Sequence, residues 1–173
     1  MKLFYVHKEI IIQVNELSSN PNTRFEMVTG NLFDSDCQTI TNAANCVGVM
    51  GKGIALEFKL RYPDMYADHV ERCKQKTFKV GHCYVYKSRL LPWILNFPTK
   101  SHWRQRSKLE DIQLGLDHLA VNLADWGITS LAIPAIGCGL GGLDWTVVRT
   151  EIVARLQHLG IRIVLYQPKG ANE

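Results

Sequence analysis

Apolar residues recur along this chain with two different spacings, which together predict strands alternating with helices from Arg24 onward. Short apolar runs favour strands, and segments in which apolar residues return every three or four positions favour helices. The predicted strands are residues 24–29, 37–41, 82–86, 93–97, 130–134 and 162–166, and the predicted helices are residues 53–60, 64–75, 108–126 and 145–159. Residues 9–14 fit a strand or a helical turn, and residues 18–22 have the composition of a loop.

The longest predicted helix, residues 108–126, has the clearest period. Its apolar residues share one broad face: Leu109, Ile112, Leu116, Leu119, Leu123 and Trp126. Gly127 follows directly, and glycine commonly ends a helix because it adopts the left-handed backbone conformation without steric cost. Strands that alternate with helices predict an α/β sandwich, whose ligand binds beyond the carboxyl ends of the strands.

Two glycine-bearing turns each connect a predicted strand to a predicted helix. The first begins with Asn42–Asn45 and runs through residues 49–55, Val-Met-Gly-Lys-Gly-Ile-Ala; the second is residues 134–142, Pro-Ala-Ile-Gly-Cys-Gly-Leu-Gly-Gly. Glycine lets a backbone approach a ligand closely, and N–H groups ahead of a helix can bind an anion. Two such turns at one edge predict a ligand with two phosphates held from both sides. Two plain tight turns are the alternative.

Composition changes this picture little. The chain has 173 residues, 46% of them hydrophobic, and a net charge of +4, which predicts one mildly basic domain. Residues 1–22 are expected to form an N-terminal extension and residues 23–173 the domain. The five cysteines form no C-x-x-C pair, so we expect neither a metal site nor a disulfide framework. Without a signal peptide or a membrane span, a cytoplasmic, monomeric protein is predicted.

Several motifs in the same order resemble the macrodomain family, whose members bind ADP-ribose. The resemblance extends from about Phe25 to Gln167 and rests on Gly30-Asn31-Leu32 and on the two glycine turns. Residues 46–55, 58–63, 96–104 and 137–145 are most similar to the DNA ADP-ribosyl glycohydrolase macrodomains of DarG-type antitoxins. The resemblance implies a three-layer α/β/α sandwich around a mixed, mostly parallel six-stranded sheet.

The resemblance also implies an ADP-ribose site, with no further cofactor. The diphosphate would lie between the two turns, and Asn31 would face the adenine where many macrodomains have an aspartate. Asn45 would lie near the distal ribose. The implied ligand-binding residues are Asn31, Leu32, Asn45, Met50, Gly51, Gly53, Ile54, Thr99, Pro134, Gly137, Cys138, Gly139, Leu140 and Gly141. Asn31 and Asn45 also fit the role of local, turn-forming side chains.

Lys100 is the predicted catalytic residue, because it follows an apolar strand at the edge where a ligand would bind. A desolvated lysine can act as a general base or attack C1″ as an amine nucleophile, and the sequence leaves both mechanisms open. A lysine that only attracts phosphates is the alternative. His102, Trp103 and Arg104 suit contact with a nucleic acid, although a solvated loop has the same composition. Asp144 is expected to cap the helix that follows it.

The predicted function is therefore removal of ADP-ribose from ADP-ribosylated DNA bases. The expected partners are ADP-ribosylated single-stranded DNA and an ADP-ribosyltransferase toxin. The alternatives are an ADP-ribose reader, an ADP-ribose 1″-phosphate phosphatase and a hydrolase of ADP-ribosylated protein. The chain departs from the pattern at Gly141, since the human terminal ADP-ribose glycohydrolase has an aspartate near that point to pair with its lysine.

Overall fold

A computed structural model describes residues 23–170 and contains one six-stranded sheet. The strands lie in the order β1-β6-β5-β2-β4-β3, and only β3 runs antiparallel to its neighbour. Their bounds are β1 Arg24–Val28, β2 Thr39–Asn45, β3 Tyr84–Tyr86, β4 Trp93–Lys100, β5 Ser130–Pro134 and β6 Arg162–Tyr166. The mixed, mostly parallel sheet predicted from the sequence is confirmed. The expectations for residues 9–14 and 18–22 lie outside the described residues.

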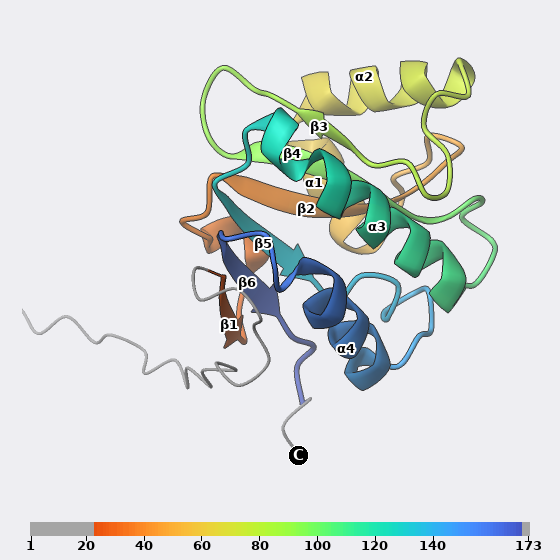
Figure 1. The fold of residues 1–173 in the computed structure, drawn as a ribbon. Coiled ribbons are helices and arrows are strands. Elements are labelled where there is room, and N and C mark those ends of the chain that lie inside the picture. Colours follow the sequence, from red (N-terminus) through yellow and green to blue (C-terminus); the bar gives the residue numbers. More distant parts are fainter. Residues whose placement is uncertain (1–22, 171–173) are drawn as a thin grey trace, which may run out of the picture.

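Within the described part of the chain, four α-helices cover the two faces of this sheet (Figure 1). They are α1 Gly53–Arg61, α2 Pro63–Lys74, α3 Leu109–Trp126 and α4 Trp145–Leu156, and a 3-10 turn, η1, spans Leu32–Asp34. Helices α3 and α4 lie on one face, and α1 and α2 on the other. The three-layer α/β/α arrangement is therefore confirmed. Gly127 ends α3 with φ 75°, as predicted.

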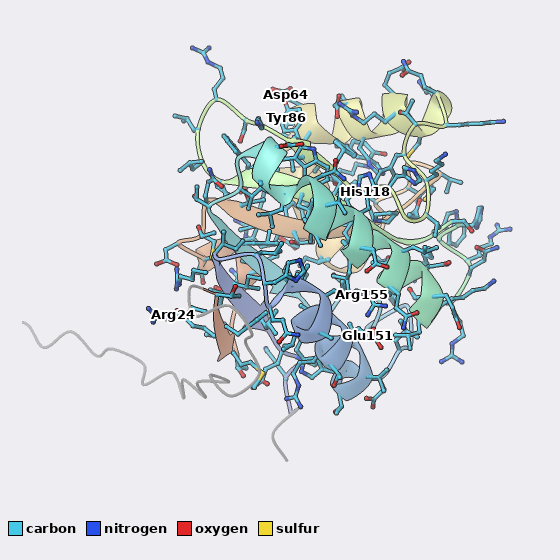
Figure 2. All side chains as sticks on the ribbon, in the orientation of Figure 1. Arg24, Asp64, Tyr86, His118, Glu151 and Arg155 are labelled. Carbon is cyan, nitrogen blue, oxygen red and sulfur yellow. The ribbon has the colours of Figure 1, made fainter. Side chains whose placement is uncertain are left out.

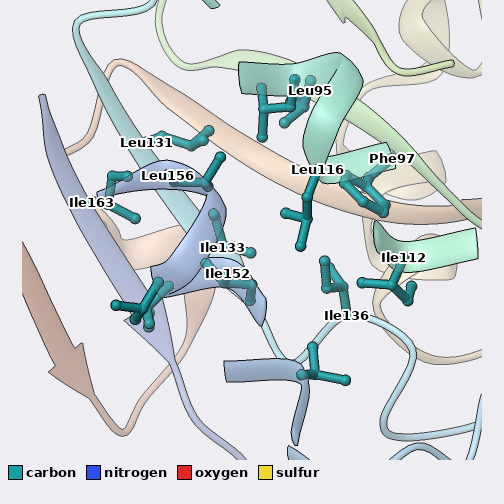
Figure 3. Close-up of a cluster of buried hydrophobic side chains, with 14 of the residues drawn as sticks. Leu95, Phe97, Ile112, Leu116, Leu131, Ile133, Ile136, Ile152, Leu156 and Ile163 are labelled. Carbon is teal, nitrogen blue, oxygen red and sulfur yellow. The ribbon is translucent and has the colours of Figure 1, made fainter. Parts of the chain in front are cut away.

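Each face of the sheet has its own hydrophobic core. Under α3 and α4, the buried residues include Leu95, Phe97, Ile112, Leu116 and Ile152 (Figure 3). The core under α1 and α2 is smaller and includes Phe58 and Met65. An ion pair of 2.8 Å between Arg155 Nε and Asp117 Oδ1 joins α4 to α3. Figure 2 shows the Arg155 side chain on α4. Two cores fix the sheet from both sides and so fix the edge at which its strands end.

Strand β2 is longer than the sequence predicts. The sequence predicted that this strand ends at Thr41 and that Asn42–Asn45 belong to the glycine turn. This prediction is wrong, because these four residues continue β2. Asn and Ala have low strand propensity, but here each is paired along β4. In addition, Asn42 Nδ2 donates to Asn96 Oδ1 at 2.8 Å, and both side chains are fully buried. Tertiary pairing thus overrides local propensity.

Candidate functional site

Five parallel strands end at one edge of the sheet, and the loops that follow them form a continuous rim. After β2 comes the first glycine loop, defined here as residues 46–53, and after β5 comes the second glycine loop, residues 135–143. The loop after β4, residues 101–108, emerges at the same edge (Figure 1). Both glycine turns therefore lie on the rim, as predicted from their positions between strand and helix.

The first glycine loop leads directly into the N-terminus of α1. Met50 is buried at 1% exposure and holds the loop against the sheet, whereas Gly51 is exposed. Lys52 precedes the helix with no side-chain cap, and the first helical hydrogen bond runs from Leu56 N to Lys52 O at 3.4 Å. No acceptor within the described residues pairs with the backbone N–H groups of Gly53 and Ile54, so these groups can bind an anion.

The second glycine loop is closed by its own backbone. Leu143 N donates to Gly137 O at 3.0 Å, and Gly142 N donates to Cys138 O at 3.1 Å. Cys138 N itself donates to Ala135 O at 3.1 Å, so this predicted ligand donor is already used within the loop. Among residues 23–170, no acceptor pairs with the N–H groups of Gly137, Gly139, Leu140 and Gly141.

The two glycine loops lie side by side. A Cβ atom built on Gly53 would be 3.7 Å from Leu140 Cδ1, so the tip of the second loop reaches the start of α1. Gly53 itself has φ 59°, a left-handed conformation that favours glycine. Unpaired N–H groups of the two loops therefore lie near each other at the same edge of the sheet.

Lys100 and Asn45 face each other at the ends of adjacent strands. They are register partners of β4 and β2, and Lys100 is half-buried. Among residues 23–170, no carboxylate pairs with the Lys100 ammonium group. Asn45 Nδ2 donates to Val49 O, and Asn45 Oδ1 accepts from the N–H groups of Val47 and Val49. The Asn45 amide therefore shapes the first glycine loop, as its turn-forming alternative predicts.

Thr99 directly precedes Lys100 and is buried at 4% exposure. Its hydroxyl donates to Ala44 O at 3.2 Å, across the boundary between β4 and β2. The sequence predicted Thr99 as a ligand-binding residue, but this hydroxyl is directed into the sheet.

A cleft of about 360 Å³ continues the rim at the ends of β1, β5 and β6. It brings together four predicted ligand-binding residues, Asn31, Leu32, Ile54 and Pro134, with eight others that were not predicted to bind the ligand: Gly30, Phe33, Glu57, Ala135, Tyr166, Gln167, Pro168 and Lys169. Asn31 Oδ1 accepts from Phe33 N at 3.2 Å and caps η1. Tyr166 was predictable in principle, because it ends a strand whose carboxyl end belongs to the rim.

An aromatic and cationic stack projects from the loop after β4. The rings of His102 and Trp103 stack with centroids 5.5 Å apart, and the Arg104 guanidinium lies 4.6 Å from the Trp103 centroid. His102 Nδ1 accepts from Arg104 N at 3.2 Å, which orders the loop, and Trp103 remains 45% exposed. The loop is joined to the second glycine loop by a 3.1 Å hydrogen bond from Ser107 N to Gly141 O.

Burial shifts the pKa values of the ionisable side chains next to the glycine loops. It raises the pKa of Cys138 to about 11 and that of Cys46 to about 12, so both thiols stay protonated at neutral pH. Burial also lowers the pKa of His69 to about 4, which keeps its imidazole neutral. None of the five cysteines is bonded to another, and no cluster within residues 23–170 has the composition of a metal site.

Two expectations at the second glycine loop can be compared with its geometry. Asp144 does cap α4, since its Oδ1 accepts from Val147 N at 3.1 Å. Gly141 is tightly enclosed, because a Cβ built on it would lie 2.3 Å from both Gly137 O and Ser107 Oγ. A larger residue does not fit here without a shift of the backbone. No helix within residues 23–170 is long and apolar enough to cross a membrane.

Comparisons with known proteins agree with this geometry. The DNA ADP-ribosyl glycohydrolase of Mycobacterium tuberculosis is 42% identical over 148 residues, which are 83% of this chain and 42% of that protein. A DNA ADP-ribosyl transferase-DNA ADP-ribosyl glycohydrolase fusion protein of Thermosipho africanus is 38% identical over 160 residues, covering 82% of this chain and 41% of the relative. The chain thus spans about two fifths of the length of these relatives.

Among solved structures, Thermosipho africanus DarTG in complex with ADP-ribose superposes with a TM-score of 0.82 at 38% identity. The match covers 89% of this chain and 43% of that one. The family model of the Macro domain matches residues 41–152, from β2 through most of α4. This chain belongs to the Macro domain family.

Proposed function

We propose that this chain is an ADP-ribosyl glycohydrolase that removes ADP-ribose from ADP-ribosylated DNA bases, with Lys100 as its catalytic residue. The observation that carries the proposal is the position of Lys100 at the ligand-binding rim, opposite Asn45 and beside the strand that leads into the first glycine loop. The names of the Mycobacterium tuberculosis and Thermosipho africanus relatives support the reaction and the acceptor. The domain that carries this activity would comprise residues 23–173.

In this proposal the two glycine loops hold the diphosphate. The free N–H groups of Gly53 and Ile54 and the helix dipole of α1 favour negative charge on one side. The free N–H groups of Gly139 and Leu140 favour negative charge on the other side. Met50, Gly51, Gly137, Cys138 and Gly141 shape the backbone of the two loops around the ligand.

The adenine would occupy the cleft at the ends of β1, β5 and β6. Phe33 and Tyr166 line it, and aromatic rings bind a planar base by stacking. Asn31 Oδ1 already accepts one hydrogen bond, but an amide oxygen has a second lone pair for the adenine amino group. Leu32 and Pro134 would complete the apolar wall. With the base here and the diphosphate between the loops, the distal ribose points toward Asn45 and Lys100.

Lys100 can act on the distal ribose in two ways. As a general base its neutral amine takes a proton from water, which attacks C1″ while the C–N bond to the DNA base breaks. As a nucleophile the amine itself forms a bond to C1″ as the base leaves with the bonding electron pair, and water then cleaves the adduct. Intact-mass analysis after an acid quench separates the two, because only the second mechanism adds an ADP-ribosyl mass to Lys100.

The loop after β4 supplies the acceptor side of the site. His102, Trp103 and Arg104 form an exposed stack next to Lys100 along the chain, and such a stack binds an unpaired base and its phosphates. Single-stranded DNA is therefore the proposed substrate. The transferase fused to the Thermosipho africanus relative suggests an ADP-ribosyltransferase toxin as the enzyme whose product this chain removes. Monomeric state and cytoplasmic location stay predictions.

The test compares three substrates: ADP-ribosylated single-stranded DNA, ADP-ribosylated protein and ADP-ribose 1″-phosphate. Wild type is expected to release ADP-ribose from the DNA, and Lys100→Ala to lose at least about a thousandfold in kcat while still binding ADP-ribose. Lys74→Ala, at an exposed lysine that ends α2 outside the loops of the rim, is the control and should keep full activity. Binding without release from any substrate would identify a reader instead, and turnover of only the phosphate or the protein would identify the corresponding alternative enzyme.

A further inference from the structure

Strand β4 contains one residue more than its neighbour immediately before Lys100. Ala44 is the register partner of Pro98, but the next residue, Asn45, is the partner of Lys100. Thr99 therefore has no partner on β2. This is a β-bulge, a feature that bends a strand and redirects the side chains beyond it.

Regular pairing flanks this bulge on both sides. Residues 39–44 pair one to one with residues 93–98, and beyond the bulge Cys46 N donates to Ser101 O at 3.2 Å. If the regular pairing continued without a bulge, Asn45 would pair with Thr99, and Lys100 would lie one position further along the rim. Because side chains alternate between the faces of a strand, such a slip also turns the lysine to the other face.

The hydroxyl of Thr99 is the contact that holds the bulge. It is 4% exposed and donates to Ala44 O at 3.2 Å, so it bonds the strand at the residue where the register changes. A bulge interrupts the backbone ladder, and a carbonyl left there without a donor is costly to bury. The threonine hydroxyl supplies a donor to such a carbonyl, Ala44 O, at the point where the register changes.

We infer that Thr99 is a positioning residue that places the Lys100 amine opposite Asn45 by stabilising this bulge. The inference rests on the proposed function for its kinetic consequence, because Lys100 must act on substrate for its position to affect turnover. Thr99 acts through Lys100, and its hydroxyl is directed into the sheet rather than at the ligand.

The decisive variant is Thr99→Val, which keeps the branched shape and removes only the hydroxyl donor. Its expected effect is a loss of kcat of at least tenfold, with the Kd for ADP-ribose changed less than about twofold, since the glycine loops are untouched. Thr99→Ser restores the hydroxyl and should recover most of kcat. A Thr99→Val enzyme with the kcat of wild type would overturn the inference.

Thr41 provides the matched control. It lies on β2 in the same sheet and is fully buried, and no group within residues 23–170 is hydrogen-bonded to its Oγ1. Thr41→Val therefore makes the same chemical change without removing a bond, and kcat should stay within about twofold of wild type. If Thr41→Val and Thr99→Val lower kcat equally, the loss reflects general disturbance of the sheet and the inference is wrong.

Two further measurements keep the inference testable when activity or folding fails. NMR of ¹³C-dimethylated lysines, with the Lys100 signal identified by its loss in Lys100→Arg, reports the position of the amine without turnover. Thr99→Val should shift this signal, whereas Thr41→Val and Thr99→Ser should not, even if wild type proves inactive and the proposed function fails. If Thr99→Val does not fold, Thr99→Ala replaces it, and equal kcat and equal Lys100 signals in the Ala and Ser variants would contradict the inference.

Discussion

The two glycine loops occupy equivalent places in the fold but are stabilised in different ways. Each follows a parallel strand and leads into a helix at the same edge of the sheet. The first loop is held by the amide of Asn45 at the end of β2 and by the buried side chain of its own Met50. The second loop is closed by bonds among its own backbone groups and tolerates no side chain at Gly141.

This difference shows that similar sequences of glycines can serve different purposes. In the second loop, glycine at position 141 is required by the protein itself, because Gly137 O and Ser107 Oγ occupy the space of a Cβ. A Cβ built on Gly51 would lie 3.9 Å from its nearest neighbour, and one built on Gly139 would have no atom within 4 Å. The fold therefore does not require glycine at these two positions. A requirement for glycine at Gly51 and Gly139 would therefore come from the ligand.

The largest effect is expected from Gly141→Ala. The added methyl group would overlap a backbone carbonyl, so the free energy of unfolding should fall by about 3 kcal/mol, as for overpacked sites. Gly139→Ala in the same loop has open space around it and should change stability by less than about 0.5 kcal/mol. Urea denaturation of both variants measures the difference. Equal stability of the two would show that the second loop is not rigidly closed.

A smaller, pH-dependent effect on stability is expected from fully buried His69 on α2, the helix that is joined to the first loop by a 3.2 Å hydrogen bond from the Tyr66 hydroxyl to Gly48 O. Burial lowers the pKa of His69 to about 4, so between pH 6.5 and that value the unfolded chain takes up a proton that the folded chain does not. Stability is fully present above pH 6.5 and falls as the pH drops, by about 2 kcal/mol between pH 6.5 and 5 from this group.

His69→Gln should flatten this part of the curve of unfolding free energy against pH. His118→Gln is the matched control, because burial also lowers the pKa of His118 but its ring neighbours are His82 on the surface and Trp126, far from the loop along α3. It should leave most of the slope in place. If the slope of unfolding free energy against pH is unchanged in His69→Gln, another group causes the loss of stability at acid pH and this prediction is wrong.

The smallest of the three effects is expected from Asn45→Ala. The substitution removes three hydrogen bonds to Val47 and Val49 and should lower the free energy of unfolding by about 1.5 kcal/mol. Amide hydrogen exchange should accelerate at Val49 but not at Leu143, whose N–H is bonded within the second loop. Acceleration at both amides would mean that the two loops open together.

Sequence patterns predicted the architecture because it depends on periodicity and on capping. The helix from Leu109 to Trp126, its end at Gly127 and the cap at Asp144 all follow from local chemistry, and each is confirmed. The extension of β2 through Asn45 was missed, since its stability comes from pairing with β4 and from the Asn42–Asn96 hydrogen bond. Such contacts join residues far apart in the chain and leave no local signal.

Placement on the rim was also predictable, but the detailed role of each rim residue was not. Both glycine turns were expected at the carboxyl ends of strands, where they lie. The register shift that sets Lys100 opposite Asn45 depends on the buried Thr99 hydroxyl, and nothing in the pattern of apolar residues indicates a bulge. Phe33 and Tyr166 were missed because they reach the cleft from opposite ends of the chain. The ligand contacts themselves stay predictions.

The central claim is that the two loops hold one diphosphate between them, and calorimetric titration of ADP-ribose tests it most directly. Gly51→Glu and Gly139→Glu place a carboxylate where neither position is crowded by the protein, and the matched variants Gly51→Ala and Gly139→Ala add only a methyl group. Each Glu variant should weaken binding at least about a hundredfold at unchanged thermal stability, and each Ala variant by less than about tenfold. Wild-type affinity in either stably folded Glu variant would contradict the claim.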